Sequence, residues 1–115
     1  MTETDRYVDQ IVREFCNLPG TSGRLGPADR RFARSLHNCR VPLDVVRAAL
    51  LLATARRLLR DTNDVEPLPV VRSLAYFRHT IDELLAAPLD LAYLTYVRRK
   101  LDQAKNGARP QPRGA

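Results

Sequence analysis

Three clusters of cationic side chains are the residues of this sequence best suited to bind a ligand. They lie at 30–34, 56–60 and 98–100, and nearly all of them are arginines. A guanidinium presents a planar fork of N–H donors that matches a phosphate or a carboxylate, and it also stacks on nucleobases. The predicted nucleic-acid contacts are Arg30, Arg31, Arg34, Arg56, Arg57, Arg60, Tyr96, Arg98, Arg99 and Lys100.

The positive charge of the chain is unevenly distributed. Seventeen arginines and two lysines against thirteen acidic residues give a net charge of +6. By segment, residues 1–20 sum to −2, 21–60 to +7, 61–97 to −4 and 98–115 to +5. Such blocks favour a surface that binds nucleic acid or an acidic partner. GC-rich coding also produces an excess of arginine, so composition alone does not decide whether the arginines are functional.

Residues that could carry catalysis form no recognisable constellation. The sequence has no carboxylate pair in an apolar setting, no Cys/His combination, no nucleophile elbow and no metal-ligand cluster. We therefore expect a protein that is not an enzyme and that uses no cofactor or metal. Cys16 and Cys39 lack metal-type spacing and are expected to be buried thiols. His79 has no partner at catalytic spacing and is expected on the surface.

The element expected to organise the fold is a helix over about 41–60. Up to Ala55 its polar residues Asp44, Arg47 and Thr54 share one side of the helical wheel, and apolar residues fill the other directions. A helix that is apolar almost all round is a buried one. Its roughly 15 apolar-dominated positions, interrupted by two charges, are too few to span a bilayer. The sequence therefore predicts a buried central helix and no membrane partner.

Four amphipathic helices are expected around it, over about 4–17, 27–38, 73–86 and 89–105. The helix over 73–86 could also begin a turn earlier, behind Pro69. Thr4 or Asp5 is the expected cap of the first helix. No strand-like alternation is long enough for a sheet, so the predicted fold is an all-α compact bundle of about five helices. Residues 1–105 form the predicted single domain, and 106–115 a disordered basic tail. The expected inward stripe of the fourth helix is Leu74, Phe77, Ile81, Leu84 and Leu85.

Each cationic cluster also has a structural interpretation. An arginine stripe on 27–38 is consistent with a face that only meets water, and arginines near 60 suit the negative end of a helix dipole. Tyr93, Tyr96 and Lys100 share one flank of the last helix, where the tyrosines could instead pack on a neighbour. A helix-turn-helix is disfavoured because the second helix begins with hydrocarbon where base contacts are needed. The glycine-rich loop 20–26 lacks a P-loop ending and is expected to be flexible.

Two segments resemble the helical C-terminal domains of DnaD-like primosome proteins and of some plasmid replication initiators. They are LGPADRRFARSLHNCRVPLDVVRAALLLATARR and VRSLAYFRHTIDEL. The shared pattern is a Pro-Ala-Asp helix start, a Val-Pro-Leu opening the next helix and an aromatic-rich Ser-Leu-Ala-Tyr-Phe segment. In that family the last segment carries an aromatic, an isoleucine and a tryptophan spaced by four, and contributes with a following basic tail to single-stranded DNA binding. The matching positions here are Phe77, Ile81 and Leu85, without the tryptophan.

The sequence thus supports two functions. The first is a small basic accessory protein that contacts the phosphates of a nucleic acid, with DNA the expected partner; the resemblance implies a role in replication or in a mobile element. The alternative is a protein-interaction module, as a homodimer or an adaptor, that docks through uncovered apolar surface and binds no nucleic acid. Since the sequence shows no signal-peptide layout, the cytoplasm is the expected location.

Overall fold

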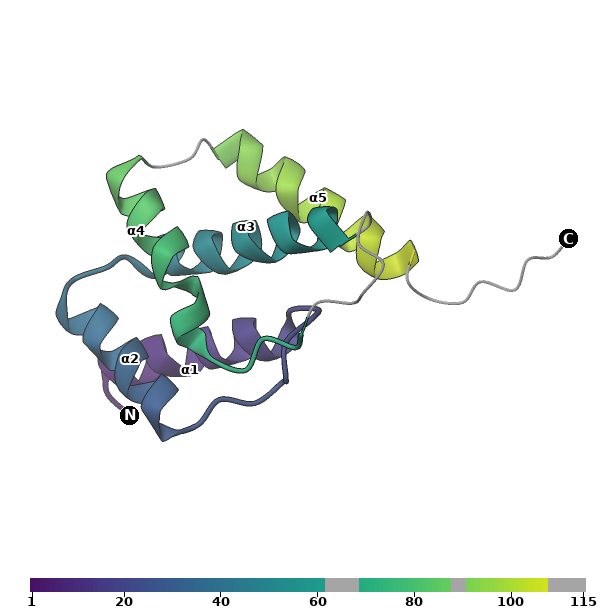
Figure 1. The fold of residues 1–115 in the computed structure, drawn as a ribbon. Coiled ribbons are helices and arrows are strands. Elements are labelled where there is room, and N and C mark those ends of the chain that lie inside the picture. The colour runs from purple at the N-terminus through teal and green to yellow at the C-terminus, as the bar shows by residue number, and fades with distance from the viewer. Residues whose placement is uncertain (62–68, 88–90, 108–115) are drawn as a thin grey trace, which may run out of the picture.

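A computed structural model of the chain describes residues 1–61, 69–87 and 91–107, and these residues form helices joined by short connections (Figure 1). The described residues contain five α-helices and no named strand, so the prediction of an all-α bundle of about five helices is confirmed. None of these helices is long and apolar enough to cross a lipid bilayer. The elements are α1 (Glu3–Asn17), α2 (Pro27–Asn38), α3 (Leu43–Asp61), the 3-10 turn η1 (Leu74–Phe77), α4 (Arg78–Ala86) and α5 (Leu91–Gly107).

Helix α3 is the centre of the fold, packed against α1, α4 and α5. Val46 and all residues of 49–55 are buried, which confirms the predicted buried central helix. Thr54, which the sequence places on the polar side of this helix, is instead buried among apolar neighbours. Its hydroxyl donates a hydrogen bond of 2.7 Å to the carbonyl of Leu50, so the buried polar group is satisfied within the helix.

Aromatic packing joins α1 to the start of α4. Phe15 and Phe77 are both buried, and their rings meet edge to face with centroids 6.0 Å apart. Of the predicted stripe on the fourth helix, only Leu85 is wrong: it is 45% exposed, whereas the other four residues are buried. The expected continuous helix from Ser73 begins instead as η1, with the Ser73 hydroxyl accepting from the N–H of Ala75.

The ends of α1 and α5 differ from their predicted positions. The cap of α1 is Thr2 rather than Thr4 or Asp5, because Thr2 and Asp5 form a reciprocal capping box with two hydrogen bonds of 3.1 Å. The backbone N–H of Thr2 is the main cause that lowers the pKa of Asp5. Helix α5 continues to Gly107, so the first two residues of the predicted tail 106–115 are helical. The remainder of that tail, 108–115, lies outside the described residues.

Helix α2 packs on α1 and η1 and buries only part of its surface. Ala33 and Leu36 are buried, whereas Cys39 at the end of the helix is exposed; Cys16 is also exposed, so the expectation of two buried thiols is wrong. Asp29, in the first turn of α2, lies next to η1. Its carboxylate accepts from the N–H of Leu74 at 2.9 Å and from the hydroxyl of Ser73 at 3.2 Å. Asp29 therefore connects the start of α2 to the start of η1.

The glycine-rich loop after α1 is held against the segment before η1, so its predicted flexibility is wrong at 20–22. Thr21 and Val71 form an isolated bridge, and the N–H of Val71 donates to the carbonyl of Gly20 at 2.9 Å. Arg57 on α3 donates to the same carbonyl at 3.2 Å and also to the carbonyl of Pro69. Arg57 thus joins two loops that lie far apart in the sequence.

We expect Gly20→Ala to destabilise the protein more than Gly23→Ala. Both glycines have positive φ, 80° and 75°, so each alanine should lose about 1–2 kcal/mol through left-handed strain. At Gly20 a Cβ would also lie 2.5 Å from Nη1 of Arg57, whereas at Gly23 it would meet nothing within 4 Å. Displacing the guanidinium should add about 1–2 kcal/mol to the loss. Urea unfolding followed by circular dichroism measures the free energy of unfolding of both variants. Equal losses of stability would show that the Arg57 contact is not tight.

Candidate nucleic-acid interface

The structure separates the predicted cationic cluster on α2 from the one on α5, while the α3 cluster lies on the helix against which α5 packs. Helix α2 packs on α1 and η1, whereas α5 packs on α3. Figure 1 shows α5 and α2 on opposite sides of α3. The clusters therefore have to be considered separately, according to what each cation contacts.

The α3 cluster is used by the fold. Arg56 makes a two-pronged contact with Glu83 of α4, with N–O distances of 2.9 and 2.7 Å. The hydrogen bond from Arg56 is the main cause that lowers the pKa of the Glu83 carboxyl. Arg57 donates to the loop carbonyls described above. The side chain of Arg60 lies outside the described residues. Arg56 and Arg57 thus have structural partners where phosphates were predicted.

The α2 cluster faces acidic residues of α1. Nη1 of Arg30 lies 3.7 Å from the carboxylate of Asp9, and the charge of Arg34 contributes to the lowered pKa of Asp5. Among the described residues, no carboxylate lies within ion-pair distance of Arg31. An exposed pair at 3.7 Å is worth little in stability, but it does offset the local positive charge. The α2 stripe is therefore a partly neutralised basic surface.

Helix α5 carries an exposed surface of aromatic and basic side chains, which we call the α5 face: Tyr93, Tyr96, Arg99 and Lys100. The two tyrosines are 46% and 54% exposed, and their ring centroids lie 6.3 Å apart. Nζ of Lys100 lies 5.6 Å from the centroid of the Tyr96 ring. Within the described part of the chain, no carboxylate forms an ion pair with Arg99 or Lys100. These rings and charges are therefore available to a ligand.

Arg98 does not belong to this face, although it precedes Arg99 in the sequence. It lines a small polar hollow of about 190 Å³ together with Glu14, Arg47 and Asp102. Nε of Arg47 lies 2.9 Å from the Glu14 carboxylate as an ion pair, in an orientation that does not form a hydrogen bond. The predicted 98–100 block is thus divided, with Arg98 placed among charges of both signs.

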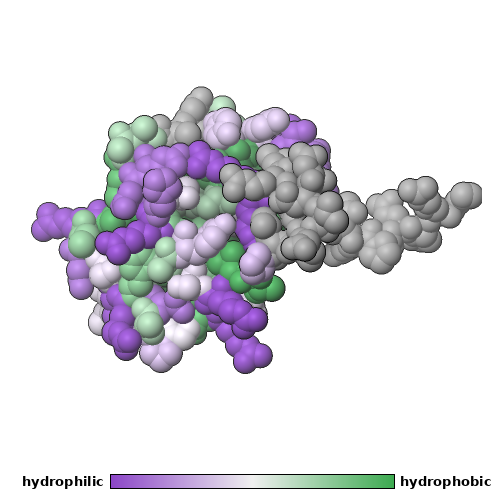
Figure 2. Space-filling view, viewed as in Figure 1, coloured by the Kyte–Doolittle hydropathy of each residue, from purple (hydrophilic) through white to green (hydrophobic). Residues whose placement is uncertain are grey.

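An apolar groove of about 650 Å³ lies between the end of α3 and the segment that contains η1. Val71 and Ala53 contribute buried apolar surface, and Tyr76 and Val70 are about half exposed at its edge. The groove could not be predicted from the sequence, because its walls come from segments far apart in the chain. On the face shown in Figure 2, apolar areas are small and alternate with hydrophilic ones where the described residues form the surface.

The residues that match the DnaD-like aromatic motif are mostly part of the core. Phe77 and Ile81 are each 1% exposed, so neither can contact DNA in this structure, and only Leu85 is exposed. Within the described residues, no three His, Cys, Asp or Glu side chains are grouped so that they could hold a metal ion. The chain matches no protein-family model, and comparison with curated proteins and with solved structures finds no significant match.

Proposed function

We propose that the protein is a small accessory protein that binds single-stranded DNA through the α5 face. The observation that carries this proposal is the arrangement of Tyr93, Tyr96 and Lys100, with exposed rings 6.3 Å apart and a cation 5.6 Å from one of them. Stacking of a base on an exposed aromatic ring is worth about 1–3 kcal/mol, and adjacent cations bind the backbone. Rings of this kind favour unpaired bases, because the faces of paired bases are already stacked in a duplex.

The remaining features support a replication or mobile-element role as part of this proposal. The likeness of 25–57 and 71–84 to DnaD-like helical domains is the feature that favours replication over other uses of single-stranded DNA. Phosphate contacts through Arg99 and Lys100 carry no sequence information, so the binding is expected to be independent of sequence. The α2 stripe, in which Arg31 has no acidic partner among the described residues, contributes a weaker general attraction to the same polyanion.

The test is fluorescence anisotropy with a labelled single strand of about 20 nucleotides and the matching duplex. We expect the single strand to bind more tightly than the duplex at low salt. Two phosphate contacts on a single strand predict a salt slope of about −1.4, or about sevenfold weaker binding between 50 and 200 mM salt. Failure of both DNAs to bind at low salt would exclude the proposed function.

A protein-interaction module is the second candidate, and the apolar groove is the observation that favours it. Tyr76 and Val70 leave apolar surface uncovered at its edge, next to Arg72 and His79. Specific interfaces usually bury more than about 1,000 Å² in total, so a partner would have to extend beyond the groove. Light scattering coupled to size exclusion tests the homodimer directly: a monomer at all concentrations would exclude it.

A further inference from the structure

Arg40 occupies a backbone conformation that usually belongs to glycine. Its φ is 60°, and it is the one described residue other than glycine with a positive φ. It ends α2 in a Schellman motif, in which the N–H of Arg40 donates to His37 and the N–H of Val41 donates to Leu36. Glycine is the common residue at this position because a Cβ strains the left-handed conformation. An arginine here carries strain that a glycine would avoid.

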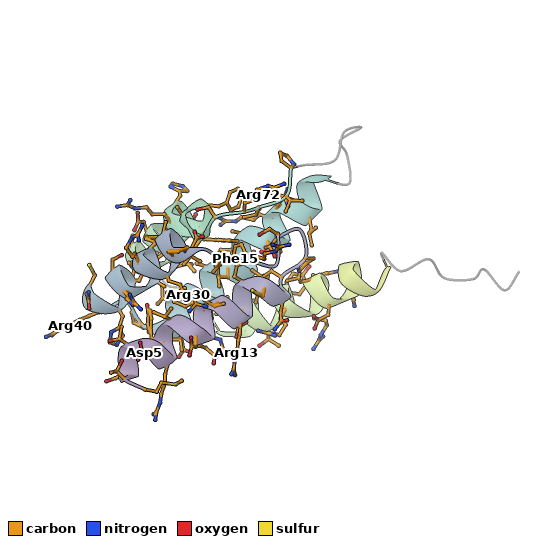
Figure 3. All side chains as sticks on the ribbon, turned by 90° about the horizontal axis from the view of Figure 1, so that it is seen from below. Asp5, Arg13, Phe15, Arg30, Arg40 and Arg72 are labelled. Atoms are coloured by element: carbon orange, nitrogen blue, oxygen red, sulfur yellow. The ribbon has the colours of Figure 1, made fainter. Side chains whose placement is uncertain are left out.

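The side chain of Arg40 lies on the rim of an open hollow of about 740 Å³. Figure 3 shows it extending away from the body of the protein beyond the end of α2. Arg6 on α1 is a second cation of the lining, and Glu3 is its one carboxylate. The other polar side chains around the hollow are Thr4, Tyr7, Gln10, His37 and Asn38.

The wall of the hollow is fixed by a network among α1, α2 and the segment before α3. The buried hydroxyl of Tyr7 donates to the carbonyl of Val41 at 2.8 Å, and the Tyr7 ring packs on His37 with centroids 4.8 Å apart. Nδ1 of His37 and the hydroxyl of Thr4 are hydrogen-bonded at 3.0 Å. Burial raises the pKa of Tyr7 to about 12, so the phenol keeps its proton and this donor. The wall of the hollow is therefore held in place without a ligand.

We propose that this hollow binds a phosphate group, with Arg40 and Arg6 as its guanidinium ligands. Two arginines in the lining of one hollow suit a phosphate because each presents paired N–H donors to its oxygens. The contact offsets the strain at Arg40, in the way that strained residues at ligand sites are retained by the contact they make. If the phosphate belongs to a DNA backbone, the inference rests on the proposed function; if it belongs to a free phosphate or a phosphorylated small molecule, it does not.

The decisive variant is Arg40→Gly, for which stability and binding should change in opposite senses. Relief of the strain should raise Tm by about 2–5 °C in thermal unfolding without ligand. Loss of the guanidinium should weaken inorganic phosphate, and also single-stranded DNA, by about five- to tenfold. Amide NMR titration with inorganic phosphate measures the affinity for phosphate and shows which residues bind it. Fluorescence anisotropy measures the affinity for single-stranded DNA.

Two control variants separate the site from net charge. Arg6→Ala should weaken phosphate binding without the gain in Tm, and Arg13→Ala, on α1 but outside the lining of the hollow, should change neither. The proposal is overturned if inorganic phosphate causes no shifts around Arg40, if Arg40→Gly lowers Tm, or if it leaves phosphate affinity unchanged. Phosphate binding that persists when DNA does not bind would make this a free-anion site and would count only against the proposed function.

Discussion

Replacing Arg99 and Lys100 together by glutamate should weaken single-stranded DNA binding by about 30- to 100-fold at low salt. The variant removes two cations that have no carboxylate partner among the described residues, and it adds two negative charges beside Tyr96. The backbone of the DNA would then be repelled at the position where its bases stack. The magnitude of the salt slope should fall by about 1.4, because it falls by about 0.7 for each lost contact.

The matched control is Arg30→Glu with Arg31→Glu, which makes the same change in net charge on α2. Because Arg30 already faces Asp9, we expect only about a threefold loss of affinity. Circular dichroism should show both double variants folded, since all four side chains are exposed. Equal losses for the two pairs would mean that net charge, and not the α5 face, determines the affinity.

Replacing Phe77 by alanine should destabilise the fold by about 3–5 kcal/mol. The ring is 1% exposed and packs edge to face on Phe15, so its removal leaves a cavity between α1 and the start of α4. A domain of this size is stable by only about 5–15 kcal/mol, so the midpoint of urea unfolding should fall sharply.

The control for this variant is Leu85→Ala on α4, the helix that begins directly after Phe77. Leu85 is 45% exposed, and its truncation should cost less than about 1 kcal/mol. If the Leu85 variant were the less stable of the two, the assignment of the buried face of α4 would be wrong. A normal stability of Phe77→Ala combined with lost DNA binding would instead favour the base-stacking role that the DnaD-like resemblance implies.

The fold could be predicted because its information is local. Residues 41–60 are apolar in almost every direction around the helix axis, so the helix has no wide polar face that could meet water. Helix α3 is buried as expected. Helix ends were less predictable, since Thr2, Thr4 and Asp5 are all good caps. The structure selects Thr2 because Asp5 then completes a reciprocal pair. Leu85 was misplaced because the buried face of α4 includes Thr80, which lies on the opposite side of Ile81 and Leu84 and so leaves Leu85 outside the core.

The candidate site was predictable only in part. At 100° per residue Arg98 and Lys100 point about 200° apart, so their separation could have been inferred from the sequence, whereas the side on which Arg99 falls could not. The partners of Arg56 and Arg57 could not, because Glu83 and Pro69 are brought to them by tertiary packing across 27 and 12 residues. The strain at Arg40 also depends on the way in which α2 ends, and its sequence context gave no sign of it.

The most direct test of the account is the set of backbone amides that change on addition of single-stranded DNA to the ¹⁵N-labelled protein. We predict that the largest chemical-shift changes lie on α5 around Tyr93, Tyr96 and Lys100, with smaller changes near Arg40. The amide resonances of the buried part of α3 should not shift. Changes confined to α2 or to the apolar groove, with α5 unaffected, would contradict the central claim.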